Sequence, residues 1–594
     1  MKKSLIVKTL IGLPIASVMM TGCVDDSYDL ENINTDVEVK VNDLVIPINL
    51  DAITLSNAFD LDDGSVIKEI NGEYAVVVNG DFHSDPINIK PVVINPGTIS
   101  PIESTVYKFD GIPGAPSVPV EGRVVAYEIH EAVTDFSFGS SNVDSSIRDL
   151  LNIKGSWNIT LNLMLSDLNS AFEHIEFQQL TLTLPAGMHV SNYPCTNGDV
   201  SLGNVVVSVG RPSAITLAVD EIDFTKFTAA GFKFTPGTEG ANNGNIQFNG
   251  KVGVKSGYVL GALKPVVLTE PQLVKLTVTP QLNTINVKSV SGNVNYQIDG
   301  FDVANVTLDD IPDMLRDDDT NITLANPQLY FSVNNPMADY GLTASSGLTL
   351  ESYKYSNPRP VKVCELDAGS LIKINADKGI DGPYNFCLSP SKPDGYYEGY
   401  AAADFVGFKS LSDLLSGDGL PDYVKVTFNA PHAGPDNVTD FVLGTDLQSV
   451  HGNYTLYAPL ELGVGSQIVY QEDETGWDDE TISKITVTTL KVEATVTNSL
   501  PVDIVVSGTP LDVNGRPCVD PKTNKPVSLE GLTIAAGTTA PVELKSTGTI
   551  VGIDGIRYTA TCRVTKAGQV LSPSSPIELR DIKVTVGGSY RDTL

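Results

Sequence analysis

Strict alternation of apolar and polar residues is the dominant pattern along this 594-residue chain. It is clearest at 490–497 (LKVEATVT) and at 582–586 (IKVTV), and it recurs at 159–163 (ITLNL) and 180–184 (LTLTL). A period of two is typical of β-strands that bury one face. Because 51 glycines and 36 prolines punctuate these runs, the pattern predicts an all-β chain of several tandem antiparallel β-sandwich domains, immunoglobulin-like, with few short helices.

Three short segments carry helical signals. Asp144 stands as a capping residue before 145–151, Gly417 follows 410–416 as a stop signal, and Pro312 lies near the start of a segment at 310–315. We expect each of them to connect strands of a sandwich.

A strand followed by Asn and Pro occurs twice, at 328–336 (QLYFSVNNP) and at 492–502 (VEATVTNSLPV). The pattern is similar to the strand–Asn-Pro–strand core of water-stress sandwich domains of the late embryogenesis abundant type. We favour an ordinary turn over a relationship to that family, because Asn tolerates left-handed geometry and Pro presets φ, and we keep the sandwich prediction.

Chain length predicts three to five domains at the usual size of about 100–200 residues. We place β-rich or β-sandwich domains at 46–150, 151–290, 291–480 and 481–594, the third with insertions. The last boundary follows a polar stretch at 472–480 (EDETGWDDE), which we expect to be an exposed loop.

The N-terminus has the layout of an exported lipoprotein. Residues 1–22 hold a positive start with Lys2 and Lys3 and an apolar stretch at 10–20, too short to span a bilayer, which needs about 20 apolar residues. The sequence MTGC at 20–23 resembles the bacterial lipobox. That resemblance implies cleavage before Cys23 and its modification by diacylglycerol and a fatty acyl chain such as palmitate, with 23–45 as a flexible acidic tether.

Acidic residues follow Cys23 directly in VDDSYDLE at 24–31. The run resembles the export tag of surface lipoproteins of Bacteroidota, which implies an outer-membrane protein held by its lipid and exposed at the cell surface. A simple solvated, disordered tether is the other interpretation, and the two are compatible. The choice between an outward-facing and a periplasmic lipoprotein stays open at this point.

The formal net charge of −33 argues against a nucleic-acid partner, because phosphates would be repelled. Motifs for common enzymes are also absent from the sequence. His130-Glu131 would need a second His at 134 for a zinc hydrolase, and that position is Thr134. There is neither a GxSxG elbow nor a phosphate-binding loop. We therefore expect no catalytic residues and no enzyme activity.

Five cysteines follow residue 190, and an exported protein can form disulfides. Cys364 with Cys387 and Cys518 with Cys562 are the two candidate pairs, and Cys195 is left over. Cys562 also lies on the apolar face of an alternating strand, where a buried thiol is the alternative.

Clustered carboxylates suggest weak calcium sites, with solvated acidic turns as the alternative. None completes an EF-hand loop, so no metal or other cofactor is firmly expected. The candidates are Asp60, Asp62, Asp317, Asp319, Asp377 and Asp381.

Aromatic residues supply the remaining candidate site. Tyr396, Tyr397 and Tyr400 lie in a glycine-rich segment, and Trp477 stands among carboxylates. Exposed rings of this kind can stack on sugars, whereas buried ones would only pack on a sheet.

Two functions follow from these expectations. The first is a non-enzymatic cell-surface lipoprotein with a structural, adhesive or protein-binding role at the outer membrane. The alternative is a glycan-binding accessory lipoprotein, similar in layout to those of polysaccharide-utilisation systems. Exposure of the aromatic side chains distinguishes the two.

Overall fold

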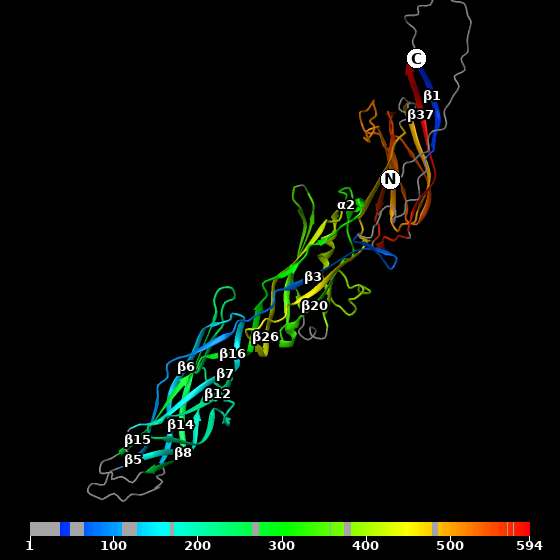
Figure 1. Cartoon of the computed structure of the whole chain (residues 1–594). Coiled ribbons are helices and arrows are strands. Elements are labelled where there is room, and N and C mark those ends of the chain that lie inside the picture. The colour runs from blue at the N-terminus through cyan, green and yellow to red at the C-terminus, as the bar shows by residue number, and fades with distance from the viewer. Residues whose placement is uncertain are drawn as a thin grey trace, which may run out of the picture.

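Almost every element of the protein is a β-strand. The computed structural model describes residues 36–47, 65–109, 127–166, 172–263, 272–356, 358–373, 382–477, 485–566, 568–573 and 575–593. Within these ranges, neighbouring strands are antiparallel apart from β23 (Tyr384–Ser389) and β24 (Asp404–Gly407), which pair in parallel. The all-β prediction is therefore confirmed. The strands form three groups along an elongated molecule (Figure 1). We call the group that contains the first and last described strands the proximal module, the next one the middle module, and the one at the far end the distal module.

The distal module holds the strands that are blue, cyan and green at one end of the molecule (Figure 1). It consists of β4 (Val92–Pro96), β5 (Ile102–Phe109), β6 (Tyr127–Val143), β7 (Ile147–Ser166), β8 (Phe172–Thr183), β9 (Met188–Val190), β10 (Cys195–Thr196), β11 (Asp199–Ser208), β12 (Ser213–Asp223), η2 (Phe224–Lys226), β13 (Phe232–Thr235), β14 (Gly244–Leu263), β15 (Gln272–Leu282) and β16 (Ile285–Gln297).

Two sheets face each other in this module. One runs β12-β7-β15-β5 and the other β11-β8-β14-β6. Phe248 of β14 stacks on Phe138 of β6 with ring centroids 5.0 Å apart, and it meets Phe224 of η2, directly after β12 of the opposite sheet, at 5.4 Å. The alternating apolar residues predicted at 159–163 and 180–184 fill this interior.

The middle module combines an early hairpin with strands from much later in the chain. It consists of β2 (Ile67–Ile70), β3 (Glu73–Ser84), β17 (Phe301–Val303), β18 (Val306–Thr307), α2 (Asp313–Arg316), β20 (Gln328–Asn334), η3 (Pro336–Tyr340), β21 (Ala344–Lys354), β22 (Val361–Lys373), β23, β24, η5 (Lys409–Leu415), β26 (Tyr423–Val442) and β27 (His451–Pro459).

Its sheet β17-β3-β27-β20-β23-β24 packs on a second sheet of β22, β21 and β26, which β16 extends. Phenylalanines hold the two faces together. The ring of Phe428 on β26 lies 5.1 Å from that of Phe82 on β3 and 6.0 Å from that of Phe331 on β20.

The proximal module contains both terminal strands. It consists of β1 (Asp36–Pro47), β19 (Asn321–Ile322), β25 (Gly417–Asp418), β28 (Glu461–Leu462), β29 (Gln467–Glu474), β30 (Ile485–Asn498), β31 (Asp503–Leu511), β32 (Leu529–Ile534), β33 (Thr538–Lys545), β34 (Ile550–Val551), β35 (Gly555–Arg563), β36 (Gln569–Val570) and β37 (Ile577–Thr593). One sheet runs β1-β37-β30-β33 and the other β25-β19-β29-β35-β31-β32.

The chain runs out along the molecule and then returns. β1 pairs with β37 from Asp36 opposite Thr593 to Pro47 opposite Lys583, so the first and the last strand of the described ranges share one sheet. β3 pairs with β27 in the middle module, and β16 pairs with β26 where the middle and distal modules meet. In Figure 1, the blue β1 accordingly lies beside the red β37.

This path corrects the predicted domain boundaries. The boundary near 150 falls inside β7, and the boundary near 290 falls inside β16. The boundary near 480 lies between β29 and β30, but β29 pairs with β35, so strands on both sides of it belong to one sheet. Tandem domains assume that every core is built from one stretch of sequence. The distal module does come from one stretch, β4 to β16, whereas the middle and proximal modules each combine segments from distant parts of the chain.

Paired backbone segments, not single linkers, join the modules. At the joint between the middle and proximal modules, the Tyr74 N–H donates to the Leu571 carbonyl at 3.0 Å, and the Ser572 hydroxyl donates to the Gly72 carbonyl at 2.7 Å. The buried Thr320 hydroxyl accepts from the Val469 N–H at 3.1 Å. Such joints resist bending because movement would break hydrogen bonds on several chain segments at once.

Two of the three predicted helices have counterparts in α2 and η5. The prediction at 144–151 is wrong, since β7 begins at Ile147. Asp144 does cap, but it caps a tight turn. Its Oδ1 accepts from the Ser146 N–H at 3.0 Å, and its carbonyl accepts from the Ile147 N–H at 3.1 Å.

The two Asn-Pro segments form the same structure in different modules. Asn335 follows β20, Asn498 ends β30, and both side chains are fully buried. Asn335 Oδ1 accepts from the Met337 N–H at 3.1 Å, and Asn498 Oδ1 accepts from the Leu500 N–H at 3.0 Å. Each Nδ2 then donates to a carbonyl beyond the turn, at 2.9 and 2.8 Å. The asparagines hold the turns through these side-chain hydrogen bonds. Neither asparagine has a left-handed backbone, which is the property of Asn that the prediction of an ordinary turn relied on.

Replacing Asn498 with Ala is expected to lower the free energy of unfolding by about 2 kcal/mol, because the Leu500 N–H and the Val502 carbonyl lose buried partners. Urea unfolding followed by circular dichroism measures the change. Asn249→Ala, at an exposed position of β14, is the matched control and should stay within about 0.5 kcal/mol of the parent protein. Equal effects of the two substitutions would contradict a structural role for Asn498.

Candidate functional site

The tyrosines predicted to touch a glycan cover the outer face of β20 instead. Tyr400 packs on Tyr330 with ring centroids 4.8 Å apart, and Tyr396 and Tyr397 meet the same ring at 6.3 Å. The Tyr400 hydroxyl donates to Asn453 Oδ1 at 3.0 Å, and the Tyr330 hydroxyl accepts from the Tyr397 N–H at 3.1 Å. Burial raises the pKa of both the Tyr330 and the Tyr400 phenol. The segment therefore serves as a lid over the sheet.

Burial corrects the sugar-contact prediction for two residues. Tyr400 is 6% exposed and Trp477 is 8% exposed, so neither ring offers a face to a ligand. The backbone at Trp477 is held beside the start of β35, where its main-chain N–H donates to the Asp554 carbonyl at 2.8 Å. Tyr396 and Tyr397 are half-buried, and glycan contact through them stays a prediction.

The exposed aromatic surface lies elsewhere, at the ends of β21 and β26. Tyr353 and Tyr423 are direct cross-strand partners whose rings stack 4.8 Å apart at an angle of 7°. Tyr355, which is 68% exposed, lies 5.7 Å from Tyr423. We call these three residues the tyrosine patch. Sequence reasoning missed the patch, although Tyr353 and Tyr355 have the two-residue spacing that places side chains on one face of a strand.

All five cysteines beyond residue 190 are free, which corrects the predicted disulfides. Cys364 is on β22, whereas Cys387 is on β23 of the facing sheet and packs with Tyr330 and Tyr400 on the outer face of that sheet. Facing sheets are about 10 Å apart, beyond the limit of about 7 Å between the Cα atoms of a disulfide.

Cys518 and Cys562, the second predicted pair, lie beside positions of β31 that are far apart. Cys562 pairs with Ile504, whereas the Cys518 N–H donates to the Pro510 carbonyl. Six residues of strand correspond to about 20 Å, so a bridge is excluded by geometry. Burial raises the pKa of the Cys387 and Cys518 thiols to about 11 and that of Cys562 to about 12. The alternative of a buried thiol at Cys562 is confirmed.

The calcium candidates find no support among the described residues, where no three His, Cys, Asp or Glu side chains form a group that could hold a metal ion. Asp317 and Asp319 stand in the turn after α2, and they bind no common centre. Asp60, Asp62, Asp377 and Asp381 lie outside the described residues, as does Cys23.

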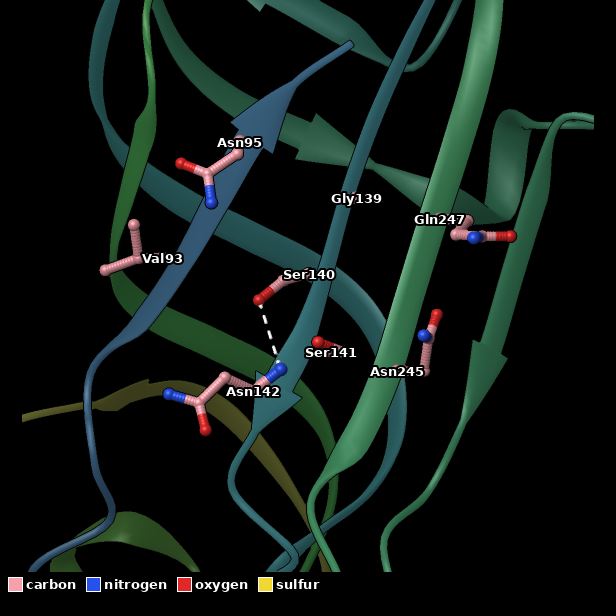
Figure 2. A pocket seen from close by; sticks show the side chains of 8 residues that line it. All are labelled: Val93, Asn95, Gly139, Ser140, Ser141, Asn142, Asn245 and Gln247. Carbon is pink, nitrogen blue, oxygen red and sulfur yellow. Dashed lines mark hydrogen bonds between the residues drawn. The ribbon is translucent and has the colours of Figure 1, made fainter.

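A polar hollow of about 440 Å³ opens on the outer face of the distal module, across β4, β6 and β14 (Figure 2). We call it the amide trough. It is lined by Val93, Asn95, Gly139, Ser140, Ser141, Asn142, Asn245 and Gln247.

Strand register creates the trough. Gly139 on β6 is the direct partner of Asn95 on β4 and of Gln247 on β14, so the three positions form one row across the sheet. Side chains of cross-strand partners point to the same face. Because glycine has no side chain, the two amides stand about 10 Å apart over an open floor. Sequence reasoning could not find this site, since three distant segments build it.

Several polar groups in the trough remain available. The Ser140 hydroxyl accepts from the Asn142 N–H at 3.3 Å, drawn as the dashed line in Figure 2. The side chains of Ser141, Asn245 and Gln247 make no hydrogen bond to any other described residue. Amide and hydroxyl groups both donate and accept hydrogen bonds, so the trough can bind a ligand that offers both.

Comparisons with known proteins assign no family. No protein-family model matches the chain, and no curated protein matches it. A solved structure from Parabacteroides distasonis, described as that of a "putative secreted protein", is similar with 14% identity over 51% of this chain and 90% of that chain. The TM-score of 0.33 is too low for this likeness to support an argument about function.

Native thiols are expected to resist alkylation at pH 8, because Cys387, Cys518 and Cys562 are buried and protonated. Mass spectrometry after iodoacetamide treatment should find them unmodified in the folded protein and modified in urea without reductant. Half-buried Cys195 is the internal control for labelling. Thiols that react only after reduction would restore the disulfide prediction.

Proposed function

We propose that this protein is a non-enzymatic, lipid-anchored surface protein that holds its distal module away from the outer membrane. The anchor is Cys23, and the proximal module is the part nearest the membrane. The distal module, with the amide trough on its side, is the part that meets partners. The role is structural and adhesive.

The proposal rests on the out-and-back path of the chain through the three modules. Because β1 pairs with β37, the chain enters the folded body at the proximal module, at the opposite end from the distal module (Figure 1). Only 12 residues separate Cys23 from Asp36, and a segment of this length spans at most about 40 Å. A lipid on Cys23 would therefore keep the proximal module close to the bilayer and point the rod outward.

Stiff joints and buried aromatics support a spacer role. Hydrogen bonds on several chain segments connect the middle and proximal modules, and β16 and β26 continue from the middle into the distal module. Burial of Trp477 and Tyr400 favours the structural class, because these rings stabilise the fold. No helix within the described ranges is long and apolar enough to cross a membrane.

Replacing Cys23 with Ala is expected to release the protein from the membrane fraction into the soluble envelope fraction, because two or three acyl chains supply the anchoring free energy. Immunoblotting of fractionated cells checks this outcome. Cys195→Ala, which leaves the lipobox intact, should stay with the membrane. Membrane fractionation of the Cys23→Ala variant would contradict the lipid anchor.

An epitope tag between Glu239 and Gly240, in the turn before β14 where Glu239 is half-buried and Gly240 is exposed, is expected to bind antibody on intact cells. The control places the same tag on a periplasmic protein of the same strain, which should bind antibody only after lysis. Access to the Glu239 tag only after lysis would contradict outward display.

A further inference from the structure

The amide trough is uncharged on the surface of a strongly acidic protein. Its eight lining residues are amides, serines, one glycine and one valine, whereas the chain carries a formal net charge of −33. Neither an anion nor a cation would find a charged partner in the trough, and the field of the whole protein opposes anionic ligands. The ligand that fits is neutral and rich in hydrogen-bonding groups.

The shape of the trough narrows the class of neutral ligand that can bind. Asn95 projects from β4 and Gln247 from β14, on either side of the glycine floor, while Ser141 and Asn245 stand along the same face (Figure 2). The hollow is open to solvent and lies on the flat face of a sheet. An open site with donors and acceptors on both rims suits an extended chain that carries hydroxyls along its length.

We propose that the amide trough is a binding site for a neutral glycan chain. Asn95 and Gln247 hydrogen-bond hydroxyls on opposite edges of one sugar ring, and the ring lies over Gly139. Ser141 and Asn245 hydrogen-bond the next unit, and Val93, which is 41% exposed, offers an apolar contact to ring carbons. This binding concerns the module that the proposed function places outermost, but it does not require the lipid anchor.

The bound sugar would replace water on groups that are already positioned. Asn95 Oδ1 accepts from the Thr284 hydroxyl at 3.4 Å, and Asn142 Oδ1 accepts from the Asn243 amide, so these two side chains are held in place from outside the trough. Prepositioned groups lose less conformational freedom on binding, which lowers the free-energy cost of association.

Gly139→Leu is the decisive variant, because it fills the floor without disturbing the sheet. A Cβ at Gly139 would meet only the Ile246 carbonyl at 3.4 Å and Gln247 Cγ at 3.6 Å, and the backbone there is not left-handed. Gly407→Leu is the matched control. It is likewise a strand glycine with room for a side chain, exposed where Gly139 is half-buried, and a Cβ there meets only the Phe405 ring at 3.6 Å or more.

The experiment probes an array of neutral plant, host and bacterial glycans, together with acidic glycans, with the purified full-length protein. We expect binding to at least one neutral glycan, a loss of at least tenfold in affinity with Gly139→Leu, and no change with Gly407→Leu. Gln247→Ala should weaken binding without affecting the unfolding midpoint.

Three results would overturn the proposal. One is the absence of binding to every neutral glycan on the array, and another is a preference for acidic glycans. The third is binding that survives Gly139→Leu but is lost with Tyr355→Ala, which would move the site to the tyrosine patch. Each result leaves the Cys23 fractionation experiment unaffected, so failure of the glycan site and failure of the anchor are distinguishable.

Discussion

Antiparallel pairing between the outgoing and the returning parts of the chain is the interaction on which the rest of the structure depends. β1 with β37, β3 with β27 and β16 with β26 bring together segments from opposite halves of the sequence. Each contact requires closure of a very long loop, which makes such topologies slow to fold. Once formed, the pairs build the middle and proximal modules from distant segments, and the pairing of β16 with β26 joins the continuous distal module to the middle one.

The same pairing gives the molecule its mechanical character. A string of tandem domains would bend at single linkers, whereas here two or more chain segments cross each joint. It also fixes orientation, because the first strand is held in the module farthest from the amide trough. The proposed role as an anchored spacer and the proposed glycan site both follow from where the pairing puts β1 and the distal module.

Local sequence patterns predicted local structure well. The alternating runs at 159–163, 490–497 and 582–586 lie in β7, β30 and β37. The recurring Asn-Pro segments proved to be one buried turn used in two modules, with Asn335 and Asn498 in the same role. In each case, the information lies within a few residues, where periodicity and side-chain capping act.

Long-range structure was beyond the sequence patterns. Domain boundaries near 150 and 290 cut through strands, because the alternation of β7 and β16 does not say which strands lie beside them. Whether Tyr400 or Tyr355 is exposed depends on what covers each sheet face, and spacing along the chain does not encode that. The amide trough needs Asn95, Gly139 and Gln247 in one row, which only the register of three strands provides.

The out-and-back path is tested most directly by cross-linking its two ends. Lys40 on β1 is the direct partner of Ser589 on β37, and such partners lie about 5 Å apart at Cα. In a protein whose other cysteines are replaced, Lys40→Cys with Ser589→Cys should form a disulfide on mild oxidation. Lys40→Cys with Lys251→Cys, on β14 of the distal module, should not. Absence of the first cross-link, or formation of the second within one molecule, would contradict the account.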